Sequence, residues 1–333
     1  MREPDLLERL AAANPVPLSE VEGASRSAPA RRLLTGLPRG HRPWARDRRV
    51  RLGRRWAVAA LAMTAVVVSI GLVLRLEGEA PATAAELLRR TAVVAADQQP
   101  SPEDGPYLYT MVQTDQLLTS SEGGRPWSVL LPTTEETWIG VDGSGRIVTT
   151  IGRARFLGER DRQRWLRAGS PELPTGRSDD VFPPGSLPHE DLSTLPTDPG
   201  RLLGVLRDQV ADEDLPRDVA VFVRVGELLA SADATPELRA ALYRVASDLP
   251  GVELLGEALD PLARDGVAVG MSYDDAGAAM RAAVVFDEET STLLAQVQVL
   301  LEPVAWIDAE PGTRITYVAY LEVGRAPTVR AVP

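Results

Sequence analysis

The sequence of 333 residues contains no cysteine and no lysine, so all 36 of its basic residues are arginine. The absence of cysteine excludes disulfide bonds, thiolate metal sites, iron–sulfur clusters and a cysteine nucleophile. The absence of lysine excludes a Walker-type phosphate loop, a Schiff-base lysine and a Ser–Lys hydrolase. Histidine occurs only at His41 and His189, which excludes a multi-histidine metal site. We therefore expect no metal site and no cofactor.

Catalytic patterns are equally scarce. His189 and Glu190 begin like the zinc-binding pattern H-E-x-x-H, but position 193 is serine. Ser144 stands between two glycines, yet its neighbours do not complete the G-x-S-x-G pattern of a nucleophile elbow. The adjacent pairs Asp179–Asp180 and Asp274–Asp275 are typical of loops and turns, because adjacency in sequence does not make carboxylates converge. We predict a protein that is not an enzyme; a hydrolase with a perturbed carboxylate in a cleft is a third hypothesis.

One long apolar run is present, WAVAALAMTAVVVSIGLVL from Trp56 to Leu74, which carries no formal charge over 19 residues. As a helix rising about 1.5 Å per residue it spans roughly 28 Å, close to the hydrocarbon thickness of a bilayer. Arg54, Arg55 and Arg75 flank it. We predict a transmembrane helix over residues 56–75, and the bilayer is thus a predicted partner. A cleaved signal peptide is the alternative, since small residues follow the run, but the preceding basic tail is too long for such a signal.

Charge is divided unequally about this run. Residues 1–55 hold 13 Arg and six acidic residues, whereas residues 76–333 hold 22 Arg and 41 acidic residues. Because the basic side of a membrane protein stays in the cytoplasm, the N-terminus is predicted to be cytoplasmic and residues 76–333 extracytoplasmic. An acidic exterior also argues against nucleic-acid binding.

Two short amphipathic motifs occur in the predicted cytoplasmic tail of residues 1–55, which is otherwise expected to be mostly disordered. Their leucines, at helical spacing, are Leu6, Leu7, Leu10, Leu33, Leu34 and Leu37. Such short helices are marginal in isolation. The tail could therefore lie near the bilayer without order, or its leucines could fold onto a cytoplasmic partner.

The extracytoplasmic region reads as a series of helices and strands. A capping box at Thr83 and Glu86 predicts a helix, followed by strands with a hairpin turn at residues 142–145 and a polar helix anchored by Trp165. Residues 169–200 are proline-rich and are expected to be a loop. Three helical patterns over residues 198–249 form a helical insertion, and five strand patterns then indicate an antiparallel meander. We predict an α+β fold whose antiparallel sheet could curve into a half-barrel.

Aromatic residues on the first strands are candidates for a ligand groove. Tyr107 and Tyr109 share one strand face by the period of two, and Trp138 lies on the next strand. Residues of this kind more often belong to a core or its rim, so the two interpretations remain open.

Three segments carry a resemblance to a known family: ERLAAANPVP (Glu8 to Pro17), LPTDPGRLLGVL (Leu195 to Leu206) and TPELRAALYRVASDLPGVELLG (Thr235 to Gly256). With the arginine-flanked apolar run, they resemble a family of actinobacterial single-pass membrane proteins of unknown function, whose genes often lie near those of extracytoplasmic-function sigma factors. The resemblance implies a membrane topology and a regulatory setting, and it supplies no catalytic residues. The order of elements is also similar to the half-open sheets of envelope lipoprotein carriers and periplasmic anti-sigma accessory proteins.

Two functions follow as hypotheses. The first is a membrane-anchored regulator or sensor that recognises an envelope ligand and acts on a cytoplasmic partner, a sigma factor, through the tail. The second is a tethered module that binds a lipid or another small ligand on the concave face of its sheet.

Overall fold

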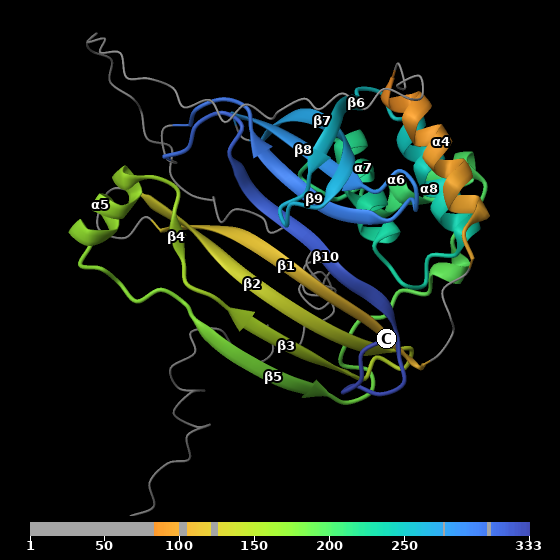
Figure 1. The fold of residues 1–333 in the computed structure, drawn as a ribbon, viewed down its shortest axis with the longest axis horizontal. Helices are drawn as coiled ribbons and strands as arrows, with labels where there is room; N and C mark the ends of the chain where they lie inside the picture. The colour runs from red at the N-terminus through yellow and green to blue at the C-terminus, as the bar shows by residue number, and fades with distance from the viewer. Residues whose placement is uncertain (1–82, 100–104, 121–125, 276, 305–307) are drawn as a thin grey trace, which may run out of the picture.

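The computed structural model describes residues 83–99, 105–120, 126–275, 277–304 and 308–333 (Figure 1). The predicted tail with its six leucines and the predicted transmembrane segment lie outside the described residues. Within the described part of the chain, no helix is both long and apolar enough to cross a membrane.

Among the described residues, ten strands form one antiparallel sheet in the order β5-β3-β2-β1-β10-β9-β8-β7-β6, and the short β4 pairs with β2 beside this path (Figure 1). Five α-helices accompany this sheet in the same part of the chain, so the predicted α+β class is confirmed. The strands are β1 (Tyr107–Ser120), β2 (Trp127–Gly140), β3 (Gly145–Ile151), β4 (Arg155–Phe156), β5 (Gly176–Phe182), β6 (Glu253–Leu259), β7 (Asp265–Asp275), β8 (Ala278–Phe286), β9 (Leu293–Leu300) and β10 (Arg314–Ala326).

The first and last of these strands lie side by side. β1 pairs with β10 from Tyr107 opposite Ala326 to Asp115 opposite Tyr317, with one register shift. This pairing joins the two blocks of strands that the sequence indicates. The predicted meander is confirmed, because β6 to β10 are consecutive neighbours in the sheet. The predicted hairpin is confirmed as well, with the backbone N–H of Ser144 donating to Asp142 at 2.9 Å between β2 and β3.

The proline-rich segment 169–200 is expected from its sequence to be a loop, but it contains strand β5, which pairs with β3 along its full length. The strand was not visible in the sequence because GRSDDVF has no alternating apolar face, and six of its seven residues are exposed. Pairing is instead accompanied by a bidentate contact of Arg146 with Asp179, at 2.7 and 2.6 Å. Polar composition of this kind is typical of an edge strand.

The helix predicted from the capping box begins after Thr83, and two further helices have caps of the same kind. Thr83, Asp198 and Thr235 each cap a helix through a side-chain oxygen that accepts a backbone N–H three residues on, and proline occupies the first turn in two of these helices. The helices are α4 (Ala84–Asp97), α5 (Glu159–Arg167), α6 (Pro199–Gln209), α7 (Arg217–Leu229) and α8 (Pro236–Asp248), with a 3-10 turn η1 (Leu192–Thr194). Trp165 anchors α5 as predicted, with its ring centroid 5.3 Å from that of Phe156.

The chain must cross the sheet between β5 and β6, because these two strands form its opposite edges. Residues 183–252 make this connection and contain η1, α6, α7 and α8. The helices gather over the β6–β9 part of the sheet, and α4 packs on the outside of α8 (Figure 1). The helical insertion is therefore a layer on one sheet face.

The main hydrophobic core lies between these helices and strands β7 and β8. Phe222 of α7, Leu242 of α8 and Phe286 of β8 are buried there, together with Leu87 of α4 and Leu202 of α6. Burial of a side chain of this size stabilises the folded state by about 1.5–3 kcal/mol. The core thus fixes α7, the helix that borders the site described next.

Candidate ligand cavity

A cavity of about 840 Å³ lies where the helical layer meets strands β1, β2, β9 and β10. A volume of this size falls within the range of roughly 300–1,000 Å³ found for small-molecule sites. Its walls come from the sheet, from α7, from the connection between α6 and α7, and from residues 188–192. The cavity is thus built by segments that are distant in sequence.

The floor of the cavity is formed by two paired strands. Side chains that alternate along β1 face it, and their partners on β2 face it too, in the pairs Leu108–Ile139, Thr110–Thr137 and Val112–Glu135. Residues two apart share one face of a strand, so these three pairs form a continuous surface along β1 and β2. The floor is apolar at one end and carries a carboxylate at the other.

The roof belongs to α7 and the segment before it, and it combines apolar with charged side chains. Ala220, Val223 and Leu228 of α7 line it, with Val210 and Leu215 from the connection to α6. The helix approaches the sheet closely at Gly226, where a Cβ atom would lie 2.7 Å from the side-chain amide of Gln296. A side chain at this position would require the end of the Gln296 side chain to move, so the glycine allows α7 and β9 to approach each other.

Residues 183–195, here called the strap, close one side of the cavity. At its start, the backbone N–H groups of Gly185 and Leu187 donate to the carbonyls of Asp142 and Gly143, both at 2.8 Å. At its end, Leu192 is buried in the main core. The strap therefore runs from the β2–β3 hairpin to the helices, across the mouth of the cavity.

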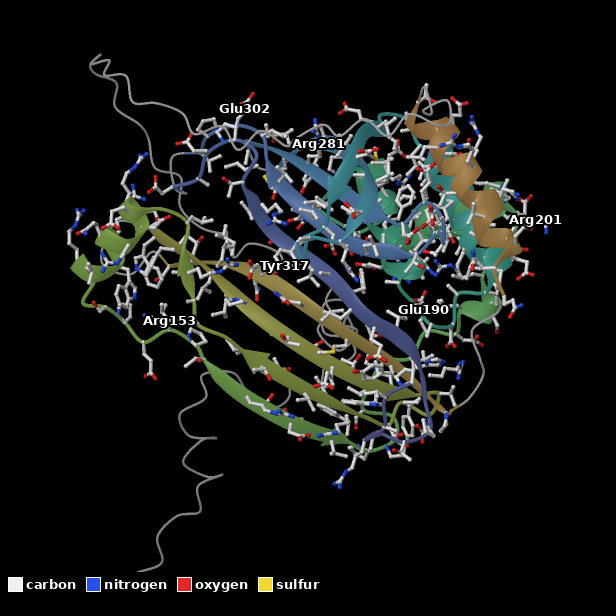
Figure 2. The ribbon with its side chains drawn as sticks, in the orientation of Figure 1. Arg153, Glu190, Arg201, Arg281, Glu302 and Tyr317 are labelled. Atoms are coloured by element: carbon white, nitrogen blue, oxygen red, sulfur yellow. The ribbon has the colours of Figure 1, made fainter. Side chains whose placement is uncertain are left out.

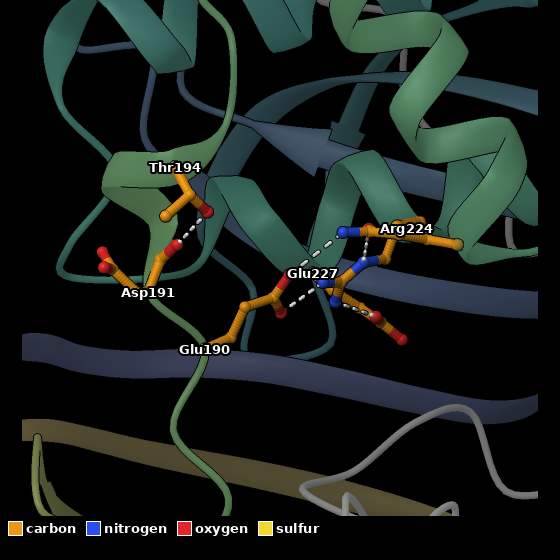
Figure 3. Close-up of polar contacts among 6 residues, drawn as sticks. Glu190, Asp191, Thr194, Arg224 and Glu227 are labelled. Atoms are coloured by element: carbon orange, nitrogen blue, oxygen red, sulfur yellow. Dashed lines mark hydrogen bonds and ion pairs between the residues drawn. The ribbon is translucent and has the colours of Figure 1, made fainter. Parts of the chain in front are cut away.

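Glu190 connects the strap to the roof. Its carboxylate is paired with the guanidinium of Arg224 on α7, and Arg224 also contacts Glu227 at 3.0 Å and Gln209 at 3.3 Å (Figure 3). Figure 2 places Glu190 between the helices and strand β10. Burial lowers the pKa of Arg224, but hydrogen bonds and charges from Glu190 and Glu227 outweigh it and raise this pKa above its ordinary value. The guanidinium thus stays charged, with its partners in place.

Another ion pair, at the edge of the cavity, links the sheet to the helical layer. Arg325 of β10 pairs with Asp233, which lies in the connection between α7 and α8, and it donates to the carbonyl of Gly105 at 3.1 Å. Its position opposite Leu108 in the β1–β10 register places it beside the cavity floor. The two layers are therefore held together by charged contacts as well as by the core.

Two polar residues of the sheet stand out within the cavity. Glu135 is half-buried, and burial raises the pKa of its carboxyl, against the lowering effect of the hydroxyl of Thr149 at 3.5 Å. Tyr320 lies 2.8 Å from the side-chain amide of Gln296, and burial raises the pKa of its phenol. Tyr320 is therefore neutral, whereas Glu135 is held in an environment that penalises its charge.

The aromatic residues predicted for a groove lie on the opposite face of the sheet from the cavity. Tyr109 and Trp138 are 1% and 2% exposed, and they pack against each other with ring centroids 5.0 Å apart. Tyr107 packs against the same cluster, which also contains Val148 and Ala326. These three side chains form a small core of their own and do not line the cavity.

The cavity-facing residues were missed although they alternate with the predicted ones. Leu108, Thr110 and Val112 stand between and beyond the two tyrosines, so the period of two separates the two faces in the sequence. The connection of residues 183–252 determines which of the two faces meets the helices. The alternating pattern of a strand does not show on which side that connection passes.

The structure also shows where the histidine, serine and paired-aspartate motifs of the sequence lie. His189 and Glu190 both line the cavity, but the described residues contain no group of three or more side chains that could hold a metal ion. Asp142 accepts from the backbone and hydroxyl of Ser144 in the hairpin turn. Asp179 pairs with Arg146, and Asp274 accepts from the N–H of Gly277 in the β7–β8 turn.

Known proteins offer little guidance to this site. No protein-family model and no curated protein sequence matches the chain. A solved structure that matches is described as "Crystal structure of MucB in complex with MucA(peri)", with 14% sequence identity and a TM-score of 0.27. The match covers 74% of this chain and 59% of that one. A TM-score this low establishes no relationship, and the resemblance to the actinobacterial membrane proteins stays a prediction.

Proposed function

We propose that the described residues form a non-enzymatic binding domain for a small, largely apolar ligand. The observation that carries this proposal is the cavity of about 840 Å³, with apolar side chains on both its roof and its floor. A site of this size and lining is typical of ligands that bury most of their surface on binding. The sheet would act as the half-barrel wall and the strap as the cover.

Filling the cavity tests this proposal. Thr110→Trp introduces a large side chain on the floor, at a strand position where aromatic residues are well tolerated. Met111→Trp is the matched control, because it places the same side chain on the opposite face of β1. We expect the neutral fluorophore 1-N-phenylnaphthylamine to bind the wild-type chain and Met111→Trp, and to lose binding in Thr110→Trp. Equal binding by all three proteins, or none by the wild type, would refute the proposal.

A second candidate function places this domain in a membrane-anchored sensor. The support is in the sequence: the apolar run Trp56–Leu74, the basic tail before it and the acidic region after it. In this proposal the domain is extracytoplasmic, the N-terminus is cytoplasmic, and ligand occupancy outside is reported to a sigma factor bound by the tail. The resemblance at residues 8–17, 195–206 and 235–256 supports the same setting.

Leucine-to-aspartate changes test the sensor proposal in cells that contain the full chain. Leu10→Asp with Leu34→Asp places charges in both apolar stripes of the tail, whereas Ser25→Asp adds a charge in the polar stretch between them. We expect a sigma factor to copurify with the wild type and Ser25→Asp but not with the double variant. Unchanged copurification and transcription in the double variant would exclude this role for the tail. Protease digestion of intact cells would check the topology, since cleavage beyond residue 83 requires an extracytoplasmic domain.

A further inference from the structure

Carboxylates outnumber guanidinium groups among the described residues that line the cavity. Its acidic residues are Glu135, Glu190, Asp212, Glu213 and Glu227, and its only arginine is Arg224 among the described lining residues. That guanidinium is already paired with Glu190 and Glu227. An anionic ligand would have to displace one of these carboxylates and would meet the others at short range, which is unfavourable. The described lining residues therefore disfavour an anionic ligand.

Glu135 is the carboxylate on the cavity floor, and it contacts the hydroxyl of Thr149 at 3.5 Å, at the outer limit for a hydrogen bond. No arginine lies within ion-pair distance of it in the described part of the chain. Its cross-strand neighbour on the floor is Val112, so the polar group stands next to apolar surface. The carboxylate is thus shielded from water on one side without a cation beside it among the described residues.

Three other shielded carboxylates of the described chain are paired with arginine. Asp115 is paired with Arg155, Asp233 with Arg325, and Asp260 with Arg264. Pairing of this kind is expected, because a carboxylate removed from water without a partner is costly. Glu135 instead faces the cavity, which leaves space beside its carboxylate for a cationic group that a ligand would bring.

We propose that the cavity binds a cationic amphiphile, with an ammonium or guanidinium group on Glu135 and an apolar chain between Leu108, Ile139 and Val223. This inference rests on the proposed binding function. The cationic group would donate to the carboxylate and neutralise it, while the chain would cover the apolar end of the floor and the roof above it. The raised pKa of Glu135 agrees with this assignment, since burial in the cavity destabilises its charged form.

Three ligands of equal chain length test the inference on the full chain in nanodiscs: octylamine, octan-1-ol and octanoate, each displacing 1-N-phenylnaphthylamine, with empty nanodiscs as the blank. We expect octylamine to displace the fluorophore at a concentration about tenfold below that of octan-1-ol, the gain of one charged hydrogen bond. Octanoate is expected to be weaker than either.

Glu135 and Glu136 are adjacent on β2 but face opposite sides of the sheet, so their glutamine variants form a matched pair. Glu135→Gln should raise the octylamine concentration needed by about tenfold and leave octan-1-ol unchanged, which also shows that the variant is folded. Glu136→Gln, whose side chain lies with Tyr109 on the far face, should behave as the wild type. Equal binding of amine and alcohol, preference for octanoate, or an unchanged amine preference in Glu135→Gln would overturn the inference but leave the binding function standing. Failure of all three ligands to displace a bound fluorophore would likewise overturn only the inference, whereas failure of the fluorophore itself to bind the wild type would refute both.

Discussion

Replacing Glu190 by glutamine tests whether the strap is held to the roof by its ion pair with Arg224. The Arg224 side chain is 14% exposed and that of Glu190 is 41% exposed, so the pair is partly shielded from solvent. Exposed pairs contribute about 0.2–1 kcal/mol and hydrogen bonds to charged groups about 1.5–3 kcal/mol. Glu227 stays bonded to Arg224 at 3.0 Å, so the variant leaves no unpaired guanidinium. We therefore expect the free energy of unfolding to fall by about 1 kcal/mol.

Urea unfolding measures this loss, and amide hydrogen exchange at Gly185 and Leu187 locates it in the strap, where both amides donate across to the β2–β3 hairpin. Exchange there should accelerate, while amides of the β7–β8 pairing should be affected only through global unfolding. Arg89→Gln is the control: its pair with Asp248 is 60% and 57% exposed, and its removal should cost less than about 0.5 kcal/mol. An equal loss in both variants, or unchanged exchange in the strap, would refute the reasoning.

Four further changes have defined outcomes in urea unfolding. Leu242→Ala empties a fully buried position of the main core and should cost about 2–5 kcal/mol. Gly226→Val brings a side chain against Gln296 where α7 packs on β9 and should cost about 1–3 kcal/mol. Asp198→Ala removes the cap of α6 and should cost about 1 kcal/mol. Burial raises the pKa of Glu135 in the folded state, so its charged form opposes folding. Glu135→Gln should therefore be more stable than the wild type at pH 7. This gain in stability should vanish as the pH falls below the pKa of a glutamate in the unfolded chain, about 4.3.

Local features of the fold could be predicted because local chemistry determines them. Thr83, Asp198 and Thr235 cap helices through side chains that reach their own first turn, and the Asp142–Gly145 turn closes through contacts two residues apart. The meander from β6 to β10 follows from short connections between neighbouring strands. β5 escaped prediction because its pairing depends on β3 and on Arg146, not on a pattern of its own.

The cavity could not be predicted from the sequence, since it depends on contacts between distant segments. The pairing of Tyr107 with Ala326 joins the first strand of the sheet to the last, and only this pairing brings Tyr320 beside Val112 on the cavity side of the sheet. The tyrosines of β1 drew the prediction to one strand face, whereas the neighbouring threonine and aliphatic residues form the floor. Composition alone does not choose between two such faces.

The position of the cavity follows from the topology of the sheet. The chain leaves β5 at one edge and must enter β6 at the other, so residues 183–252 cross a whole sheet face. Over β7, β8 and β9 the crossing is helical, and α7 brings enough apolar side chains to fill the space. Over β1 and β2 it is the strap, which contains a turn at residues 184–185 and the short η1 but no α-helix. The sheet continues beneath the point where the crossing connection changes from the strap to the helices, and the cavity lies at this point. Glu135 lines it from the sheet and Arg224 lines it from α7. The same connection that completes the fold thus produces both the cavity and its cover.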